Sequence, residues 1–345
     1  MAAPSRDALR ETKYVLPDAI GFAERQLVAI DPKANDDRGA GNVKRDPQLE
    51  VRDLGSDLWI WRLRHPGWTE EADWQPIVTC TCVDLGSERL LLDPLVPPPD
   101  ASAVWDRLDA RPPTAVVVLI PDHLRPSWRP PAVIDAAKRA GGPIEWSPDL
   151  LARRYGCVTY GPAAFEPGQE LETTVRPIAA DMVLPGGAVA LADPRGFSET
   201  PMWLPEQRVL VFADALTERN GELRMWTMRD IDGSAPRAFR ALLHLPFERV
   251  IISHGEPVHG RAEYERALDR PPWPGSPLHL YAWKGDLEIV RRLVARGDDL
   301  NARDDDKGHT VLDWARGGGH QPVIDYLVSI GATESETRPK TGTEQ

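Results

Sequence analysis

The stretch from Val116 to Trp128, VVVLIPDHLRPSW, is the part of this chain that decides its fold. The apolar residues from Val116 to Ile120 are followed at once by a polar group that includes His123 and Arg125. An apolar run of this length is typical of a buried strand, and polar side chains just beyond such a strand commonly form a site. The stretch therefore predicts a strand that delivers His123 to a functional site.

The composition predicts a globular protein that binds neither nucleic acid nor membrane. The 345 residues carry a formal net charge of -12 without any run of Lys and Arg, whereas nucleic acids and anionic lipids require a dense basic face. No apolar run approaches the length of a membrane span, and the N-terminal residues, MAAPSRDALRETK, carry charges where a signal peptide has an apolar core. The odd number of cysteines, Cys80, Cys82 and Cys157, indicates reduced thiols. We therefore expect a cytoplasmic protein.

Hydrophobic patterning divides the chain into four parts. They are residues 1–50, 51–270, 274–333 and 334–345. The first part is an N-terminal extension, partly disordered, with one expected helix near Pro17–Ile30, and the last is a polar, disordered tail. In the second part, a hairpin with its turn at Gly86 and Ser87 precedes alternating strands and helices, among them a helix over 131–140. This order predicts an α/β (α+β) domain of two packed sheets with helices outside.

Four segments of this second part resemble, in order, those of the metallo-β-lactamase superfamily. They are similar to an early strand that ends in Asp, the metal motif HxHxDH, the hairpin before a metal-bridging Asp, and the last strand with its terminal His. The segments are ERLLLDPLVP at 88–97, the stretch 116–128, ETPMWLPEQRVLVFADAL at 199–216 and VIISHGEPV at 250–258. The resemblance covers about Val51 to Leu268 and implies an αββα sandwich of the metallo-β-lactamase type.

The resemblance also implies a metal centre from which most ligands are missing. The ligand positions of HxHxDH fall on Pro121, His123, Arg125 and Pro126. Among these four, only His123 can bind a metal ion. The bridging Asp corresponds to Asp214 and the terminal His to His254. The segment before the hairpin contains no His, although Asp193 or Arg195 lies near the expected place.

Three ligands are enough for one catalytic ion. A zinc or iron ion on His123, Asp214 and His254 would form a mononuclear hydrolase centre for esters, thioesters or lactones. In the family these positions belong to different halves of a two-metal site, so they need not converge, and the Arg125 cation would repel a divalent ion. We therefore expect no metal cofactor, and a guanidinium of Arg125 that pairs with Asp214 in place of the missing ion.

Ordinary structural roles are open for the same residues. His123 would then be a loop or cap residue, Asp214 a helix N-cap, and His254 a hydrogen-bonding partner in a turn. A metal-free enzyme that uses Asp122, His123 or Asp214 as acid or base is a further alternative. The sequence contains no nucleophile constellation that would support it.

The third part, residues 274–333, is an internal repeat with an offset of 34 residues. Ser276 matches Thr310, and the same offset relates Leu278 to Leu312, Gly285 to Gly319, Leu293 to Leu327, and Gly297 to Gly331. The offset and the start SPLHLYA resemble ankyrin repeats, whose usual period is about 33 residues. Ankyrin repeats generally bind proteins, so the resemblance implies a protein-interaction module. Bracing of the first domain, or a dimer contact, is the alternative.

Together these patterns predict a non-catalytic scaffold or binding protein, in which a metallo-β-lactamase-like domain precedes two ankyrin repeats that form a short all-α module. The missing ligands are the reason for this choice. The alternative is a mononuclear metal-dependent hydrolase with a zinc or iron ion on His123, Asp214 and His254.

Overall fold

The computed structural model describes most of the chain from Leu49 onward. The described residues are 49–69, 74–129, 144–165, 168–193, 199–226, 234–270, 272–273, 275–305 and 307–335. The N-terminal extension up to residue 48, with its expected helix at Pro17–Ile30, lies outside them, and so does the helix expected over 131–140. All but Glu334 and Ser335 of the expected C-terminal tail also lies outside.

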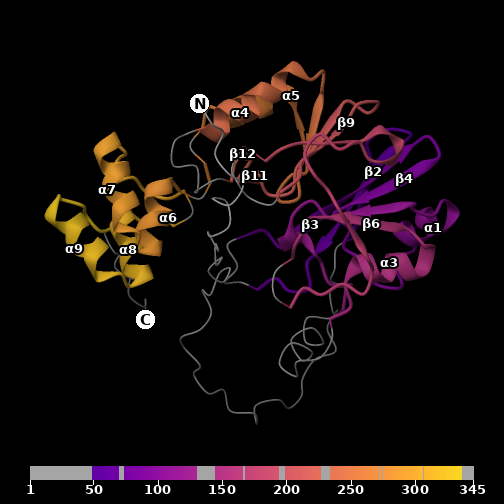
Figure 1. The fold of residues 1–345 in the computed structure, drawn as a ribbon, viewed down its shortest axis with the longest axis horizontal. Coiled ribbons are helices and arrows are strands. Elements are labelled where there is room, and N and C mark those ends of the chain that lie inside the picture. Colours follow the sequence, from indigo (N-terminus) through magenta and orange to yellow (C-terminus); the bar gives the residue numbers. More distant parts are fainter. Residues whose placement is uncertain are drawn as a thin grey trace, which may run out of the picture. The chain divides into compact units, whose positions relative to one another are not determined.

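The first sheet contains seven strands in sequence order (Figure 1). They are β1 (Glu50–Asp53), β2 (Leu58–Arg64), β3 (Ile77–Leu85), β4 (Glu88–Leu92), β5 (Ala115–Val117), β6 (Val158–Gly161) and β7 (Val175–Pro177). The strands from β1 to β4 pair antiparallel, and those from β4 to β7 pair parallel. The hairpin expected at Gly86 and Ser87 joins β3 to β4, and the φ of +64° at Gly86 explains why glycine suits this turn.

The second sheet contains five strands in the order β14-β13-β10-β9-β8. They are β8 (Val189–Ala190), β9 (Met202–Leu204), β10 (Val209–Val211), β13 (Arg249–Ile251) and β14 (Val258–Gly260). Strands β10 and β13 are parallel neighbours, so their carboxyl ends lie at the same edge of the sheet. A separate hairpin, β11 (Leu216–Arg219) and β12 (Glu222–Met225), follows β10.

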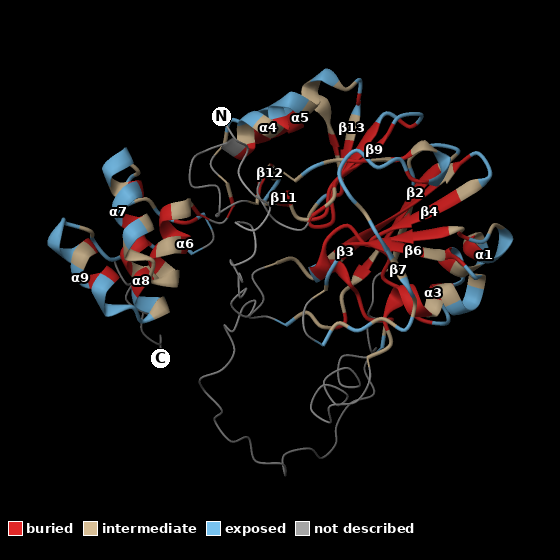
Figure 2. Ribbon diagram, in the orientation of Figure 1, coloured by how far each residue is buried: buried red, intermediate tan, exposed pale blue. Residues whose placement is uncertain are grey.

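The two sheets pack face to face and helices cover their outer faces. Leu90 and Val117 of the first sheet share one buried cluster with Val209 and Ile251 of the second. The outer face of the first sheet packs against α1 (Ser102–Ala110) and α3 (Ser147–Tyr155). That of the second packs against α4 (Ser234–Ala241) and α5 (Arg261–Ala267). Figure 2 shows the buried residues along both sheets and on the inner sides of these helices. This layering is the predicted αββα sandwich, which is thereby confirmed.

Short 3-10 turns supplement these helices. They are η1 (Pro121–His123), η2 (Pro185–Gly187) and η3 (Leu242–His244). None of the described helices has the length and apolar character needed to cross a membrane.

The C-terminal module consists of two helix pairs at the predicted repeat spacing. They are α6 (Pro277–Lys284) with α7 (Leu287–Arg296), and α8 (Val311–Gly318) with α9 (Gln321–Ser329). Gly285, Gly297 and Gly319 end three of these helices in the left-handed conformation that favours glycine. The apolar faces of all four helices form one shared buried cluster, because neither pair can bury its own face alone.

Candidate functional site

The stretch that begins at Val116 forms a buried strand followed by a tight turn. Strand β5 ends at Val117, and Pro121 then opens the turn η1, which carries His123. Proline suits the first position of such a turn, because its fixed φ is already helical and no amide hydrogen is needed there. The His123 side chain is consequently buried at the carboxyl end of the parallel strands, with 5% of its surface exposed.

The carboxylate of Asp93 holds the ring of His123. Asp93 follows β4 in a left-handed conformation, with φ at 46°, and is buried. Its Oδ1 accepts the Leu119 N–H at 2.7 Å, and its Oδ2 lies 2.6 Å from Nδ1 of His123. A carboxylate can only accept, so Nδ1 of His123 carries the hydrogen and donates it. The other ring nitrogen, Nε2, therefore faces the rest of the site.

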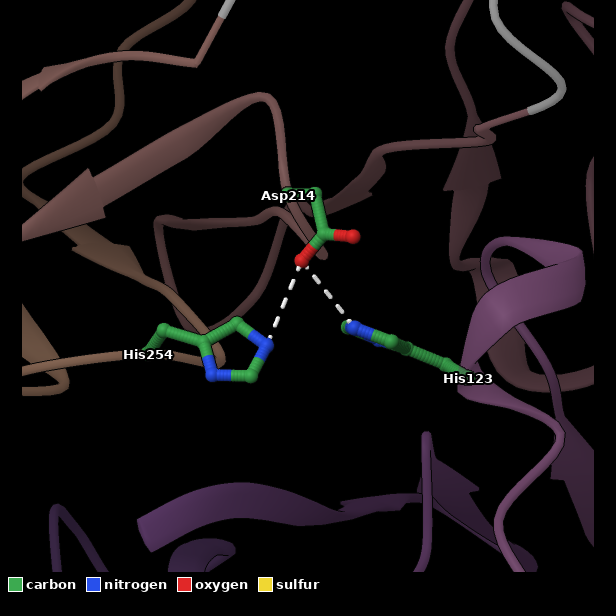
Figure 3. Close-up of side chains that lie close together, drawn as sticks. All are labelled: His123, Asp214 and His254. Atoms are coloured by element: carbon green, nitrogen blue, oxygen red, sulfur yellow. Dashed lines mark hydrogen bonds and ion pairs between the residues drawn. The ribbon is translucent and has the colours of Figure 1, made fainter. Parts of the chain in front are cut away.

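Asp214 and His254 bring their side chains to the same place from the second sheet. They follow β10 and β13, the parallel neighbours whose carboxyl ends share one edge. Oδ1 of Asp214 lies 3.0 Å from Nε2 of His123 and 3.4 Å from Nε2 of His254 (Figure 3). All three atoms lie within 4.8 Å of one another. The three residues thus converge, although the family places them in different halves of a two-metal site.

The contact between His123 and Asp214 requires a positive ion. If Nδ1 holds the only ring hydrogen, Nε2 of His123 presents a lone pair to a carboxylate oxygen 3.0 Å away, which is repulsive. The contact becomes attractive when a proton or a metal ion lies between the two atoms.

In the protein without a metal ion, the proton takes this place. Burial lowers the pKa of His123, but the Coulombic attraction of Asp214 and Asp93 outweighs it and raises the pKa to about 10. Burial raises the pKa of Asp214, yet His123 and His254 together hold it well below its ordinary value. Burial lowers the pKa of His254, which leaves that ring neutral at pH 7.

The predicted ion pair between Arg125 and Asp214 is wrong. The Arg125 guanidinium is almost fully buried, and Nη1 donates to the backbone carbonyls of Thr79 and Asp93. Nη2 lies 3.4 Å from the Ser253 hydroxyl and 3.5 Å from Nδ1 of His123, whose ring separates it from Asp214. The side chain points into the interface between the sheets, where these carbonyls accept its hydrogen bonds.

Glu199 is a functional candidate that the sequence did not reveal. It lies just before β9, in the segment where the family carries a further His ligand, and is buried. Its carboxylate accepts the N–H groups of Ala213, Asp214 and Ala215. Of the two residues expected near this place, Arg195 lies outside the described residues, and Asp193 is not among the three converging donors. An acidic residue next to an apolar hairpin was the only signal for Glu199.

The three cysteines are separate from this site chemistry. Cys80, Cys82 and Cys157 are free and buried. Burial raises the pKa of the Cys80 and Cys157 thiols to about 11 and that of Cys82 to about 12. All three are therefore protonated at neutral pH, as expected of structural thiols.

The ankyrin repeat family model matches residues 276–305. The chain is 35% identical over 66 residues to a putative glutaminase 2 of Caenorhabditis elegans, and 38% identical over 61 residues to an espin-like protein of Homo sapiens. These matches span 11% and 6% of the two relatives, about a tenth or less of their length.

Among solved structures, the chain is similar to metallo-β-lactamases. FIM-1 of Pseudomonas aeruginosa, in its mono-zinc form, is 12% identical with a TM-score of 0.46, over 64% of this chain and 93% of that one. The enzyme of Pontibacter korlensis is 18% identical with a TM-score of 0.39, over 65% of this chain and 100% of that one.

The layers and the helical repeats define the class of this protein. It has an αββα sandwich, followed by helix pairs of which the first lies in the residues that the ankyrin repeat family model matches.

Proposed function

We propose that the αββα domain is a mononuclear metal-dependent hydrolase whose single zinc or iron ion is held by His123, Asp214 and His254. The observation that carries this proposal is the convergence of three donor atoms of suitable type within 4.8 Å. It removes one of the two objections raised by the sequence, namely that ligands from different halves of a two-metal site need not meet. The missing ligands at Pro121, Arg125 and Pro126 restrict the proposal to one ion.

Two of the three spacings between the donor atoms fit such an ion. Zinc bonds of about 2.0 to 2.1 Å in a tetrahedral site place neighbouring ligand atoms about 3.3 Å apart. The distances of Asp214 Oδ1 from the two imidazole nitrogens, 3.0 and 3.4 Å, agree with this spacing. Two His and one carboxylate, with a fourth position left open, is the ligand pattern of catalytic zinc.

Hydrogen bonds orient the His123 ring for metal binding better than they orient the His254 ring. Asp93 holds the Nδ1 hydrogen of His123 and so directs the Nε2 lone pair at the site, as carboxylates commonly do for metal-binding histidines. Within the described part of the chain, Nδ1 of His254 has no hydrogen-bond partner. His123 and Asp214 would therefore bind the ion more strongly than His254.

The chemistry that a bound ion supplies is activation of water and polarisation of a carbonyl group, as in ester, thioester or lactone hydrolysis. The chain's own contribution is to position the ligands and to release the proton from Nε2 of His123 when an ion binds. Nδ1 of His123 keeps the other ring proton and donates it to Asp93, so the ring stays in place during this exchange.

Arg125 favours a second candidate, the non-catalytic scaffold. Its buried cation lies 3.5 Å from the His123 ring and opposes a dication nearby. With a protonated His123, the two cations of Arg125 and His123 balance the carboxylates of Asp93 and Asp214, and the site is neutral. The domain would then serve as a stable carrier of the ankyrin module, which would bind a protein partner.

Metal analysis separates the two candidates. We expect protein purified without chelators to contain about one zinc or iron ion per chain, and Asp214→Ala to contain almost none. Asp181→Ala, at an exposed residue outside the site, is the control and should keep its metal. Hydrolysis of chromogenic esters, thioesters and lactones should follow the metal content. A wild-type protein that stays metal-free after incubation with zinc and iron would exclude the hydrolase and support the scaffold.

A further inference from the structure

The carboxylate of Glu199 accepts hydrogen bonds from three consecutive backbone N–H groups. Oε1 accepts the Ala213 N–H at 2.9 Å, and Oε2 accepts those of Asp214 at 3.1 Å and Ala215 at 2.8 Å. The side chain is buried, with 4% of its surface exposed. Successive N–H groups that point at one anion fix the conformation of the peptide between them. Glu199 thus fixes the backbone on both sides of Asp214.

The position of Asp214 depends on this backbone, because the residue lies between strands β10 and β11 and belongs to neither. Its Oδ1 is the atom that contacts both His123 and His254. A shift of the backbone at Asp214 would therefore change both contacts together.

Other carboxylates contact the His123 ring and the loop that follows His254. His123 is held by Asp93, as described above. In the loop of His254, the Glu256 N–H donates to Oε2 of Glu218 at 2.7 Å. Separate buried carboxylates thus contact the ring of His123, the loop that follows His254 and the backbone at Asp214, and Glu199 is the one at Asp214.

We infer that Glu199 is the positioning residue for Asp214, which it places at the distance from His123 and His254 that a shared ion requires. The role of Glu199 in binding an ion rests on the proposed function. Its role in positioning Asp214 does not, because Asp214 contacts His123 and His254 in the absence of an ion. Glu199 accepts the backbone N–H of Asp214 itself, so it acts on the site through that residue.

Glu199→Gln tests the inference, because the amide keeps the size of the side chain but replaces one accepting oxygen by an NH₂ group that faces donors. A matched control is Asp149→Asn. Asp149 is also a buried carboxylate that accepts two backbone N–H groups, of Glu172 at 3.1 Å and Thr173 at 2.8 Å, and it contacts no residue of the site. Both variants lose the same kind of hydrogen bond, so comparable decreases in Tm are expected.

The decisive measurements are the imidazole ¹⁵N chemical shifts of the metal-free protein and the Kd for Co²⁺. We expect Glu199→Gln to shift the imidazole resonances of His123 and His254 and to weaken Co²⁺ binding at least tenfold, as loss of a supporting contact commonly does. Asp149→Asn should change neither. The inference is overturned if Glu199→Gln lowers the Tm like the control but leaves both readouts at their wild-type values. If the wild type binds no Co²⁺, the proposed function fails, and the imidazole shifts alone decide the role of Glu199.

Discussion

Nδ1 of His123 lies 2.6 Å from Oδ2 of Asp93, and this hydrogen bond determines which ring nitrogen faces the site. The same Asp93 carboxylate accepts the Leu119 N–H through its other oxygen. One buried side chain therefore joins the end of β4, the stretch after β5 and the candidate site. The chemistry of the site and the stability of the domain are linked at this residue.

Replacing Asp93 by Asn should lower the stability of the domain and weaken metal binding at the site. Asn tolerates the left-handed backbone at this position, but its amide has one accepting oxygen for two donors. The donor left unpaired costs about 1 to 3 kcal/mol, which urea unfolding measures. Binding of Co²⁺ should weaken about 10- to 100-fold. Asp181→Asn is the control, since Asp181 is exposed and also has a positive φ, of 66°. Equal stability losses in the two variants would contradict the role of Asp93.

Removal of the Arg125 guanidinium should destabilise the sandwich strongly. Arg125→Met leaves the carbonyls of Thr79 and Asp93 without this donor inside the protein. The expected loss is about 3 to 5 kcal/mol in the free energy of unfolding, measured by urea denaturation. Arg129→Met serves as control, because Arg129 is exposed and its ion pair with Glu145 contributes at most about 1 kcal/mol. If the Arg125 variant were as stable as this control, the buried position of the guanidinium would be incorrect.

Two neighbouring glycines of α8 should respond in opposite directions to alanine. A Cβ at Gly318 would lie 2.0 Å from the carbonyl oxygen of Trp283, whereas one at Gly317 would meet nothing closer than 3.9 Å. Gly317→Ala should stabilise the repeats by up to about 1 kcal/mol through helix propensity. Gly318→Ala should destabilise them by about 1 to 3 kcal/mol, because the helices must move apart. Hydrogen exchange of peptides from 277–329 measures both, and slower exchange in Gly318→Ala would contradict the packing of α6 on α8.

Acidification should destabilise the ankyrin module through His279. The backbone N–H of Ser276 donates to Nδ1 of His279, with 3.2 Å between the nitrogens, so Nδ1 carries no hydrogen. Nε2 lies 3.1 Å from the Ala302 carbonyl oxygen and donates to it, so the ring is neutral in the folded protein. Burial lowers its pKa below the ordinary value of 6.5. The unfolded chain therefore binds the proton more readily, and stability is retained above pH 6.5 and lost as the pH falls below it.

The pH dependence is measured by comparing variants, because His254 also has a lowered pKa. Urea unfolding at pH 7.5 and 5.5 gives the loss of free energy on acidification, to which one such group contributes at most about 1.4 kcal/mol per pH unit. We expect the loss to be smaller in His279→Gln, which cannot take up a proton. An identical loss in wild type and variant would show that His279 does not determine it.

The sequence by itself determined the elements and their class. The apolar run at Val116, the turn at Gly86 and the repeat from Ser276 are local patterns, and each depends on residues close together in the chain. These patterns were sufficient for the sandwich and the helix pairs. The local pattern also indicated His123, whereas Asp214 and His254 were indicated only by the resemblance to the metallo-β-lactamase motifs.

Only the tertiary structure decided how these residues meet. His123 and Asp214 are separated by 91 positions, and their contact depends on how the two sheets pack. The direction of Arg125 was mispredicted for the same reason, because the backbone carbonyls that accept its hydrogen bonds belong to Thr79 in β3 and to Asp93 after β4. Periodicity determines which face of an element is buried, but the partner of a buried polar group is chosen by whichever acceptor the packing brings within hydrogen-bond distance.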